Sequence, residues 1–200
     1  SAFSMGSYAA EEKTALERGK YGPLDKAPQT ALYDYPIKVS KHVYSAIGAT
    51  QPPTYENAGH NNNLSFVLGS EAVLVVNGGS NNALAKALHS EIKKITDLPV
   101  KYVISENGQG HATYGNHYWK KQGATLIGHV DAQQEIDEKG FGGLARMREY
   151  AKEYAEDTEL INFDITFDDQ HEIDLGNLLV IAKEYGSAHS PGDVTVLVPA

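Results

Sequence analysis

The sequence predicts an α/β fold, and three observations support this. Strand and helix patterns alternate between residues 64 and 129, with short connections between them. The chain has 200 residues, 41% of them hydrophobic, which supplies enough apolar side chains for one domain with a substantial core. Loops rich in Gly and Asn follow the predicted strands, and the carboxyl ends of strands are where sites usually form in folds of this class.

The bulk composition excludes several classes of function. The net charge is -9, with 26 acidic against 17 basic residues, whereas nucleic-acid binding needs clustered Lys and Arg. No apolar run reaches the roughly 18 residues that a membrane span needs. The sequence has no cysteine, so disulfides, thiol nucleophiles and thiolate metal ligands are all excluded. The first residues lack the order of an intact signal peptide, and a signal peptide already removed stays open.

The first part of the chain divides into an arm and the start of a domain. Residues 1–33 are polar and are predicted to form an arm on the surface or on a partner, and residues 34–200 are predicted to form the domain. Short strands are expected near Ile37 and Val43, because apolar and polar residues alternate there. Pro, Gly and Asn in residues 49–63 then predict a loop.

The elements that follow are assigned from hydrophobic periodicity. Residues 64–68 and 72–76 predict a hairpin, and residues 81–96 predict a helix that an Asn caps. Next come a strand at 100–105, a polar loop, a helix at 116–123 and a strand at 124–129. The remainder predicts two helices and two strand pairs, at residues 131–140, 144–157, 165–176 and 178–200.

The loop "SENGQGHATYGN", residues 105–116, gathers polar side chains at the end of a predicted strand. One interpretation is structural: Glu106 and Gln109 satisfy neighbouring backbone groups, and the glycines allow a tight turn with positive φ. The other is functional: His111 and His189 line a pocket for a small polar ligand. Further candidates for ligand binding are Asn77, Asn107 and His60.

The order of these motifs resembles the metallo-β-lactamase fold superfamily over about residues 36–200. The hairpin "FVLGSEAVLVVNGGS" is similar to the family's first strand pair, with Asn77-Gly78-Gly79 in place of Asp-Thr-Gly. The loop at 105–111 stands where the family has His-x-His-x-Asp-His, and "GSAHSPGD" resembles the Gly-x-x-His-x-x-Gly-Asp context of a later metal ligand, here His189. The resemblance implies an αβ/βα sandwich.

The same resemblance implies that the family's metal site is largely missing. Glu106, Gly108 and Gly110 replace the first two histidines and the aspartate, and only His111 and His189 are kept. The two kept histidines serve different metals in the family, and a single protein ligand does not hold zinc. The family hydrolyses its substrates with a metal-bound hydroxide, so we expect a divergent ligand-binding or structural protein without cofactor.

An alternative expectation is a hydrolase of ester, lactone or lactam type with an altered site. A single zinc, manganese or iron could be held by Glu106, His111 and His189, with His60 or Gln109 as a further ligand, or the site could work without metal. The catalytic candidates are then the same three residues, Glu106, His111 and His189.

The resemblance also predicts a partner. The chain corresponds mainly to the first half of the fold, which would leave one apolar sheet face uncovered. We therefore expect an oligomer, in which either a separate C-terminal half or a second copy of the chain covers that face. A periplasmic or secreted location is expected by analogy with relatives that carry signal peptides.

Overall fold

The structure, a computed structural model, describes residues 30–199. Its larger sheet has seven strands in the order β1-β2-β3-β4-β5-β6-β7, antiparallel from β1 to β4 and parallel from β4 to β7. The strands are β1 (Ile37–Lys38), β2 (Val43–Ala46), β3 (Leu64–Leu68), β4 (Val73–Val76), β5 (Val100–Ile104), β6 (Thr125–His129) and β7 (Ile165–Phe167). The predicted α/β class and hairpin are confirmed.

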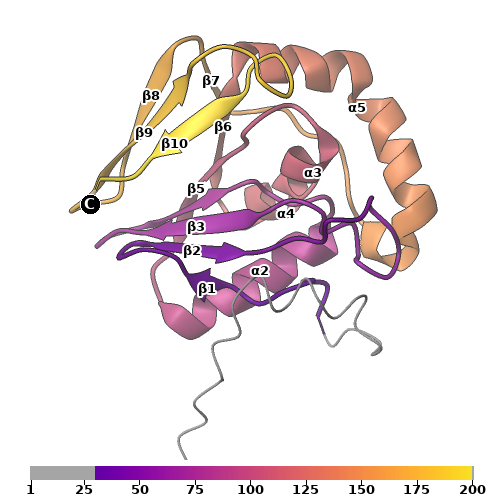
Figure 1. The fold of residues 1–200 in the computed structure, drawn as a ribbon, viewed down its shortest axis with the longest axis horizontal. Helices are drawn as coiled ribbons and strands as arrows, with labels where there is room; N and C mark the ends of the chain where they lie inside the picture. Colours follow the sequence, from indigo (N-terminus) through magenta and orange to yellow (C-terminus); the bar gives the residue numbers. More distant parts are fainter. Residues whose placement is uncertain (1–29, 200) are drawn as a thin grey trace, which may run out of the picture.

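A second, antiparallel sheet of three strands stacks against the first (Figure 1). Its strands are β8 (Gln170–Asp174), β9 (Leu179–Glu184) and β10 (Val194–Leu197), in the order β10-β9-β8. The strand pair predicted at 178–200 is confirmed, because β9 pairs with β10. The pair predicted at 165–176 is wrong: β7 pairs with β6 in the larger sheet, whereas β8 pairs with β9 in the second sheet.

The helices are α2 (Asn82–Ile95), α3 (Gly110–Thr113), α4 (Asn116–Lys121), α5 (Val130–Ala151) and the short 3-10 helix η1 (Lys152–Ala155). Helix α2 begins where the sequence predicts, since the Asn81 side chain accepts a hydrogen bond from Leu84 N at 2.8 Å. Leu84, Leu88 and Ile92 recur at helical spacing and are buried against the larger sheet, each contributing roughly 1.5–3 kcal/mol by burial.

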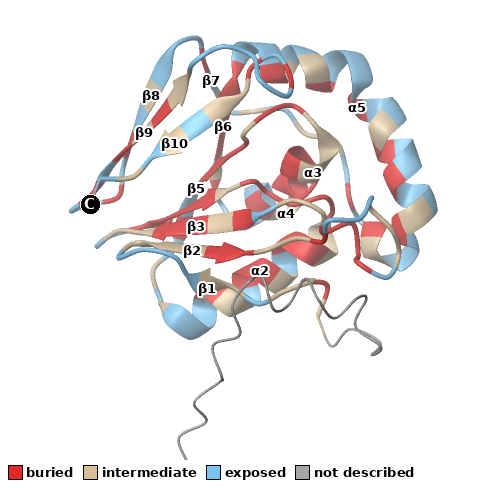
Figure 2. Cartoon of the chain, viewed as in Figure 1, coloured by how far each residue is buried: buried red, intermediate tan, exposed pale blue. Residues whose placement is uncertain are grey.

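Two apolar layers hold the fold together (Figure 2). One lies between the larger sheet and helices α2 and α4, and includes Phe66, Leu88 and Trp119. The other lies between the two sheets, where Leu74 and Ile127 belong to the same cluster as Val180. The expectation that one face of the larger sheet is uncovered is wrong, because β8–β10 supply side chains that cover it.

The two helices predicted at 131–140 and 144–157 are a single helix, α5, followed by η1. Gly140, Gly142 and Gly143 lie at the junction of the two predicted helices. Each glycine costs roughly 1 kcal/mol in a helix interior, but tertiary packing offsets this cost. Leu144 and Met147 are buried on one face of α5, which keeps the helix continuous.

Most of the predicted N-terminal arm, residues 1–29, lies outside the described residues. At its end, Ala31 and Leu32 are buried in the cluster beneath the larger sheet. Across residues 30–199, no helix is both long and apolar enough to cross a bilayer.

Candidate functional site

Asn77 fixes the base of the candidate site. It follows β4 and has a φ of 70°, a left-handed conformation that Asn tolerates better than most residues. Its Oδ1 accepts a hydrogen bond from Glu106 N at 3.0 Å, and its Nδ2 donates to Asn63 O at 3.3 Å. Asn77 is buried, so its side chain joins three segments rather than facing a ligand.

Glu106 and His111 face each other across the loop that follows β5. The carboxylate Oε1 of Glu106 lies 3.2 Å from Nε2 of His111, and their side chains are 40% and 22% exposed. Hydrogen bonding from His111 lowers the pKa of Glu106 below its usual value; burial opposes this, and Asn77 adds to it. The pair is thus an ionised carboxylate bonded to an imidazole at the surface.

The residues between them are held by local hydrogen bonds. Asn107 is buried, and its Oδ1 accepts from Gln109 N at 3.0 Å, which closes a turn. Thr113 Oγ1 donates to Gln109 O at 2.9 Å, and Ser105 Oγ donates to Ala112 O at 3.2 Å. Asn107, a ligand-binding candidate, therefore closes a turn. The structural interpretation expected Glu106 and Gln109 to satisfy neighbouring backbone groups, but their side chains bond to His111 and His189 instead.

Asp193 shapes the loop that carries His189. Its carboxylate accepts hydrogen bonds from the backbone N–H groups of Ala188, His189 and Ser190 and from the Ser190 hydroxyl. Partial burial of the carboxylate opposes ionisation, but the hydrogen bonds from Ser190, His189 and Ala188 outweigh it and hold the pKa of Asp193 at about 2. Asp193 is a turn residue, as its place in "SPGDV" predicts.

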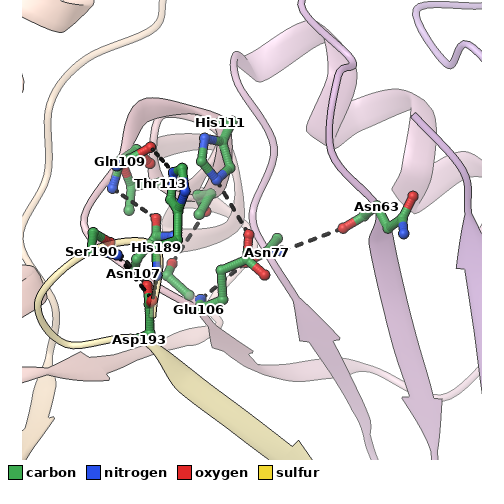
Figure 3. Close-up of polar contacts among 12 residues, drawn as sticks. Asn63, Asn77, Glu106, Asn107, Gln109, His111, Thr113, His189, Ser190 and Asp193 are labelled. Atoms are coloured by element: carbon green, nitrogen blue, oxygen red, sulfur yellow. Dashed lines mark hydrogen bonds and ion pairs between the residues drawn. The ribbon is translucent and has the colours of Figure 1, made fainter. Parts of the chain in front are cut away.

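The two loops meet at their polar side chains (Figure 3). His189 Nε2 lies 3.1 Å from Gln109 Oε1, and the ring centroids of His111 and His189 are 6.5 Å apart. Val194 N also donates to Glu106 O at 2.8 Å. We call Glu106, Gln109, His111 and His189 the loop cluster. The Asp193 carboxylate is bound to backbone groups and Ser190, so it does not orient the His189 imidazole as in a Ser-His-Asp triad.

His60 does not join the loop cluster. It is fully buried, and its Nδ1 accepts a hydrogen bond from Tyr33 N at 2.9 Å. Burial lowers its pKa to about 4, so it is a neutral packing residue. Its neighbour in sequence, Asn63, was missed as a contributor to the site. The run of three Asn at 61–63 was the only signal in the sequence that pointed to this residue. The hydrogen bond between Asn63 O and Asn77 could not be inferred without the fold.

The sequence resemblance implies a zinc site, and zinc needs three or four protein ligands around one point. Throughout the described segment, no group of three or more His, Cys, Asp or Glu side chains is arranged to hold a metal ion. Glu106 and His111 bond to each other, and His189 bonds to the amide of Gln109. The residues present therefore do not fit a zinc centre of the usual geometry.

Comparison with solved structures finds several metallo-beta-lactamases. One from Pontibacter korlensis has a TM-score of 0.61, with 17% identity over 82% of this chain. The native FEZ-1 enzyme of Legionella gormanii has a TM-score of 0.58, with 15% identity over 81%. A Cronobacter sakazakii metallo-beta-lactamase with a HARLDQ motif has a TM-score of 0.57, with 15% identity over 82%. No family model matches the sequence.

The chain has the metallo-β-lactamase fold. Identities of 15–17% support the fold alone, and they agree with a divergent sequence. The chain spans 66%, 56% and 59% of the lengths of these three structures. Asn77 follows β4, Glu106 follows β5, and His189 lies in the loop before β10. Their correspondence to the family's metal-site segments stays a prediction.

Proposed function

We propose that the chain is a metal-independent binding protein on the metallo-β-lactamase fold, and that the loop cluster receives a small, neutral, polar ligand. The observation that carries this proposal is the hydrogen bond between Glu106 and His111. It joins two side chains that a metal centre would need to direct at the metal. Together with glycines at 108 and 110, it leaves a polar surface with too few metal ligands.

The chemistry of the loop cluster favours a ligand that both donates and accepts hydrogen bonds. Glu106 offers its second carboxylate oxygen as an acceptor, and the amide of Gln109 offers donors. Nε2 of His111 and Nε2 of His189 each donate to an oxygen, so Nδ1 of the neutral ring accepts. In the part of the chain that the structure describes, no Lys or Arg side chain bonds to the loop cluster. The negative charge of Asp193 is close enough to raise the pKa of Glu106, although the hydrogen bonds to Glu106 outweigh this effect. An anionic ligand would therefore be repelled.

A hydrolase with an altered site is the second candidate, and the same pair of residues favours it. A carboxylate bonded to an imidazole orients the ring, and the free Nδ1 of His111 could take a proton from water. This reading needs no metal, and it predicts hydrolysis of a simple ester or lactone that disappears in His111→Ala.

One experiment separates the two candidates. Imidazole resonances of His111 and His189 are followed by NMR while glycerol, myo-inositol and acetamide are added, and hydrolysis of p-nitrophenyl acetate and δ-valerolactone is measured on the same sample. Binding without hydrolysis, with His42 unaffected, supports the binding protein. Hydrolysis that is lost in His111→Ala and kept in His42→Ala supports the hydrolase and contradicts the first proposal.

We further propose that the outer face of the three-stranded sheet packs against a separate C-terminal half or a second copy of the chain. Leu179 and Leu197 are 44% and 41% exposed there, on the side opposite the buried Val180 and Ala182. Among residues 30–199, β10 pairs only with β9, which leaves one edge available for strand addition.

Light scattering of the wild type and of Leu197→Glu tests the proposed assembly. We expect a dimer or a complex with a second fragment that the variant weakens, because a charge would be buried at the contact. A wild-type monomer at high concentration would contradict it. Phe141→Glu, at an exposed position on α5, is the matched control.

A further inference from the structure

Gly108 sits where the family has its second metal-binding histidine, and the structure leaves no room for a side chain there. A Cβ placed on Gly108 would lie 2.3 Å from the carbonyl oxygen of Ala132 and 2.9 Å from Cβ of Glu135. Favourable contacts between heavy atoms lie at about 3.5–4 Å. The obstructing atoms belong mainly to the backbone of α5, which cannot rotate away.

Gly110 sits where the family has its metal-binding aspartate, and the ring of Tyr114 fills the space beside it. A Cβ on Gly110 would lie 2.2 Å from Cε2 of Tyr114. The Tyr114 ring is buried, and its hydroxyl donates to Gly140 O on α5 at 3.0 Å. Its hydroxyl also lies 2.0 Å from where a Cβ on Gly143 would be. Tyr114 therefore fits between Gly110 and Gly143 and holds α5 against the loop.

Neither loop glycine has a positive φ. The sequence suggested that these glycines serve a turn with positive φ, but the structure gives a different reason for them. Space, and not backbone conformation, demands glycine at 108 and 110. Position 106 differs, because the Glu106 side chain is 40% exposed and has room.

From these contacts we infer that α5 and Tyr114 close positions 108 and 110 to metal-ligand side chains, so that restoring the family's ligands does not restore a metal site. This inference rests on the proposed function and deepens it. The loop is a packed contact between β5 and α5, and its glycines are part of that contact. The zinc chemistry of the fold is excluded here by packing as well as by the identity of the side chains.

The direct test restores the ligands in two steps. Glu106→His is compared with the triple variant E106H/G108H/G110D, and zinc binding is measured by calorimetry and elemental analysis alongside Tm. Glu106→His removes the half-exposed bond to His111, so we expect it to lose less than roughly 2 °C in Tm. The triple variant should lose at least roughly 4 °C more without retaining zinc. A triple variant that retains one or two zinc ions per chain would overturn the inference.

Alanine probes keep the test informative if the triple variant does not fold. Gly110→Ala and Gly143→Ala should each lower Tm by at least roughly 4 °C, because both crowd Tyr114. Gly142→Ala is the matched control: its Cβ would meet only Nη1 of Arg146, at 3.8 Å, so a helix-favouring residue should keep or raise Tm. Equal effects at 142 and 143 would contradict the steric argument.

A double-mutant cycle assigns the crowding at Gly110 to Tyr114. In a Tyr114→Ala background, Gly110→Ala should cost less than half of the Tm loss that it causes in the wild type, because the obstructing ring is gone. Additive losses would show that Tyr114 does not close position 110. The wild type separates the two proposals: tight zinc binding by the unmodified chain refutes the proposed function, whereas zinc gained only by the triple variant refutes this inference alone.

Discussion

Oε1 of Glu106 lies 3.2 Å from Nε2 of His111, at a place where the sequence resemblance puts two metal ligands. The two groups satisfy each other by a charge-assisted hydrogen bond. This contact ties the two ends of the loop at 106–111 together. The same loop is anchored below by Asn77 and beside β10 by the backbone of Val194.

The first prediction concerns this pair. His111→Ala should raise the pKa of Glu106 toward its ordinary value, because the hydrogen bond from His111 is the largest influence that lowers it. A carboxylate-detected NMR titration measures the change. His42→Ala is the control, since His42 bonds to Leu68 O elsewhere in the structure. An unchanged titration of Glu106 in His111→Ala would refute the pairing.

The second prediction concerns the loop that carries His189. Asp193→Asn should increase the hydrogen-exchange rates of the Ala188, His189 and Ser190 amides by roughly tenfold, since a charged acceptor binds about twice as strongly as a neutral one. Asp174→Asn is a matched control, because Asp174 accepts from Gly176 N in a distant turn. Exchange that is equally slow in both variants would mean that Asp193 does not hold the loop.

The third prediction concerns pH. In the folded protein the pKa of His60 is about 4, against 6.5 for an ordinary histidine. The unfolded chain therefore binds more protons between these values, so the contribution of neutral His60 to stability is lost as the pH falls from 6.5 to 4. The free energy of unfolding should fall by up to roughly 3 kcal/mol over this window from His60 alone.

The His60→Gln variant isolates this contribution. Its amide oxygen can still accept from Tyr33 N, but it does not titrate. Urea unfolding of both proteins at several pH values between 4.5 and 7.5 gives the comparison. Wild type should lose more stability than the variant as pH falls, and parallel curves would show that His60 is not buried in its neutral form.

The sequence was sufficient to predict the elements that depend on local patterns. The helix that Asn81 caps, the hairpin at Leu64–Val76 and the turn at Asp193 each follow from residues close together in the chain. The loop cluster was also predicted in part, because a fold resemblance placed His189 near His111.

Contacts between distant segments could not be predicted in the same way. The continuity of α5 across its glycines depends on Leu144 and Met147 and also on contacts with Tyr114 and Leu160. A helical pattern does not reveal the contacts with Tyr114 and Leu160. The three strands β8–β10 bury one face of the larger sheet, and this burial depends on how the two sheets stack. The resemblance to the family placed the loop of His60 near the mouth of the site, yet burial against Tyr33 removes His60 from the loop cluster.

The central claim is that the loop cluster works without metal, and native mass spectrometry combined with elemental analysis tests it most directly. The wild-type chain is purified without chelator, incubated with zinc and exchanged into buffer that contains none. The account predicts that the wild type retains no stoichiometric metal and that the metal content of His111→Ala is the same as that of the wild type. About one tightly held metal per chain, lost in His111→Ala, would contradict it.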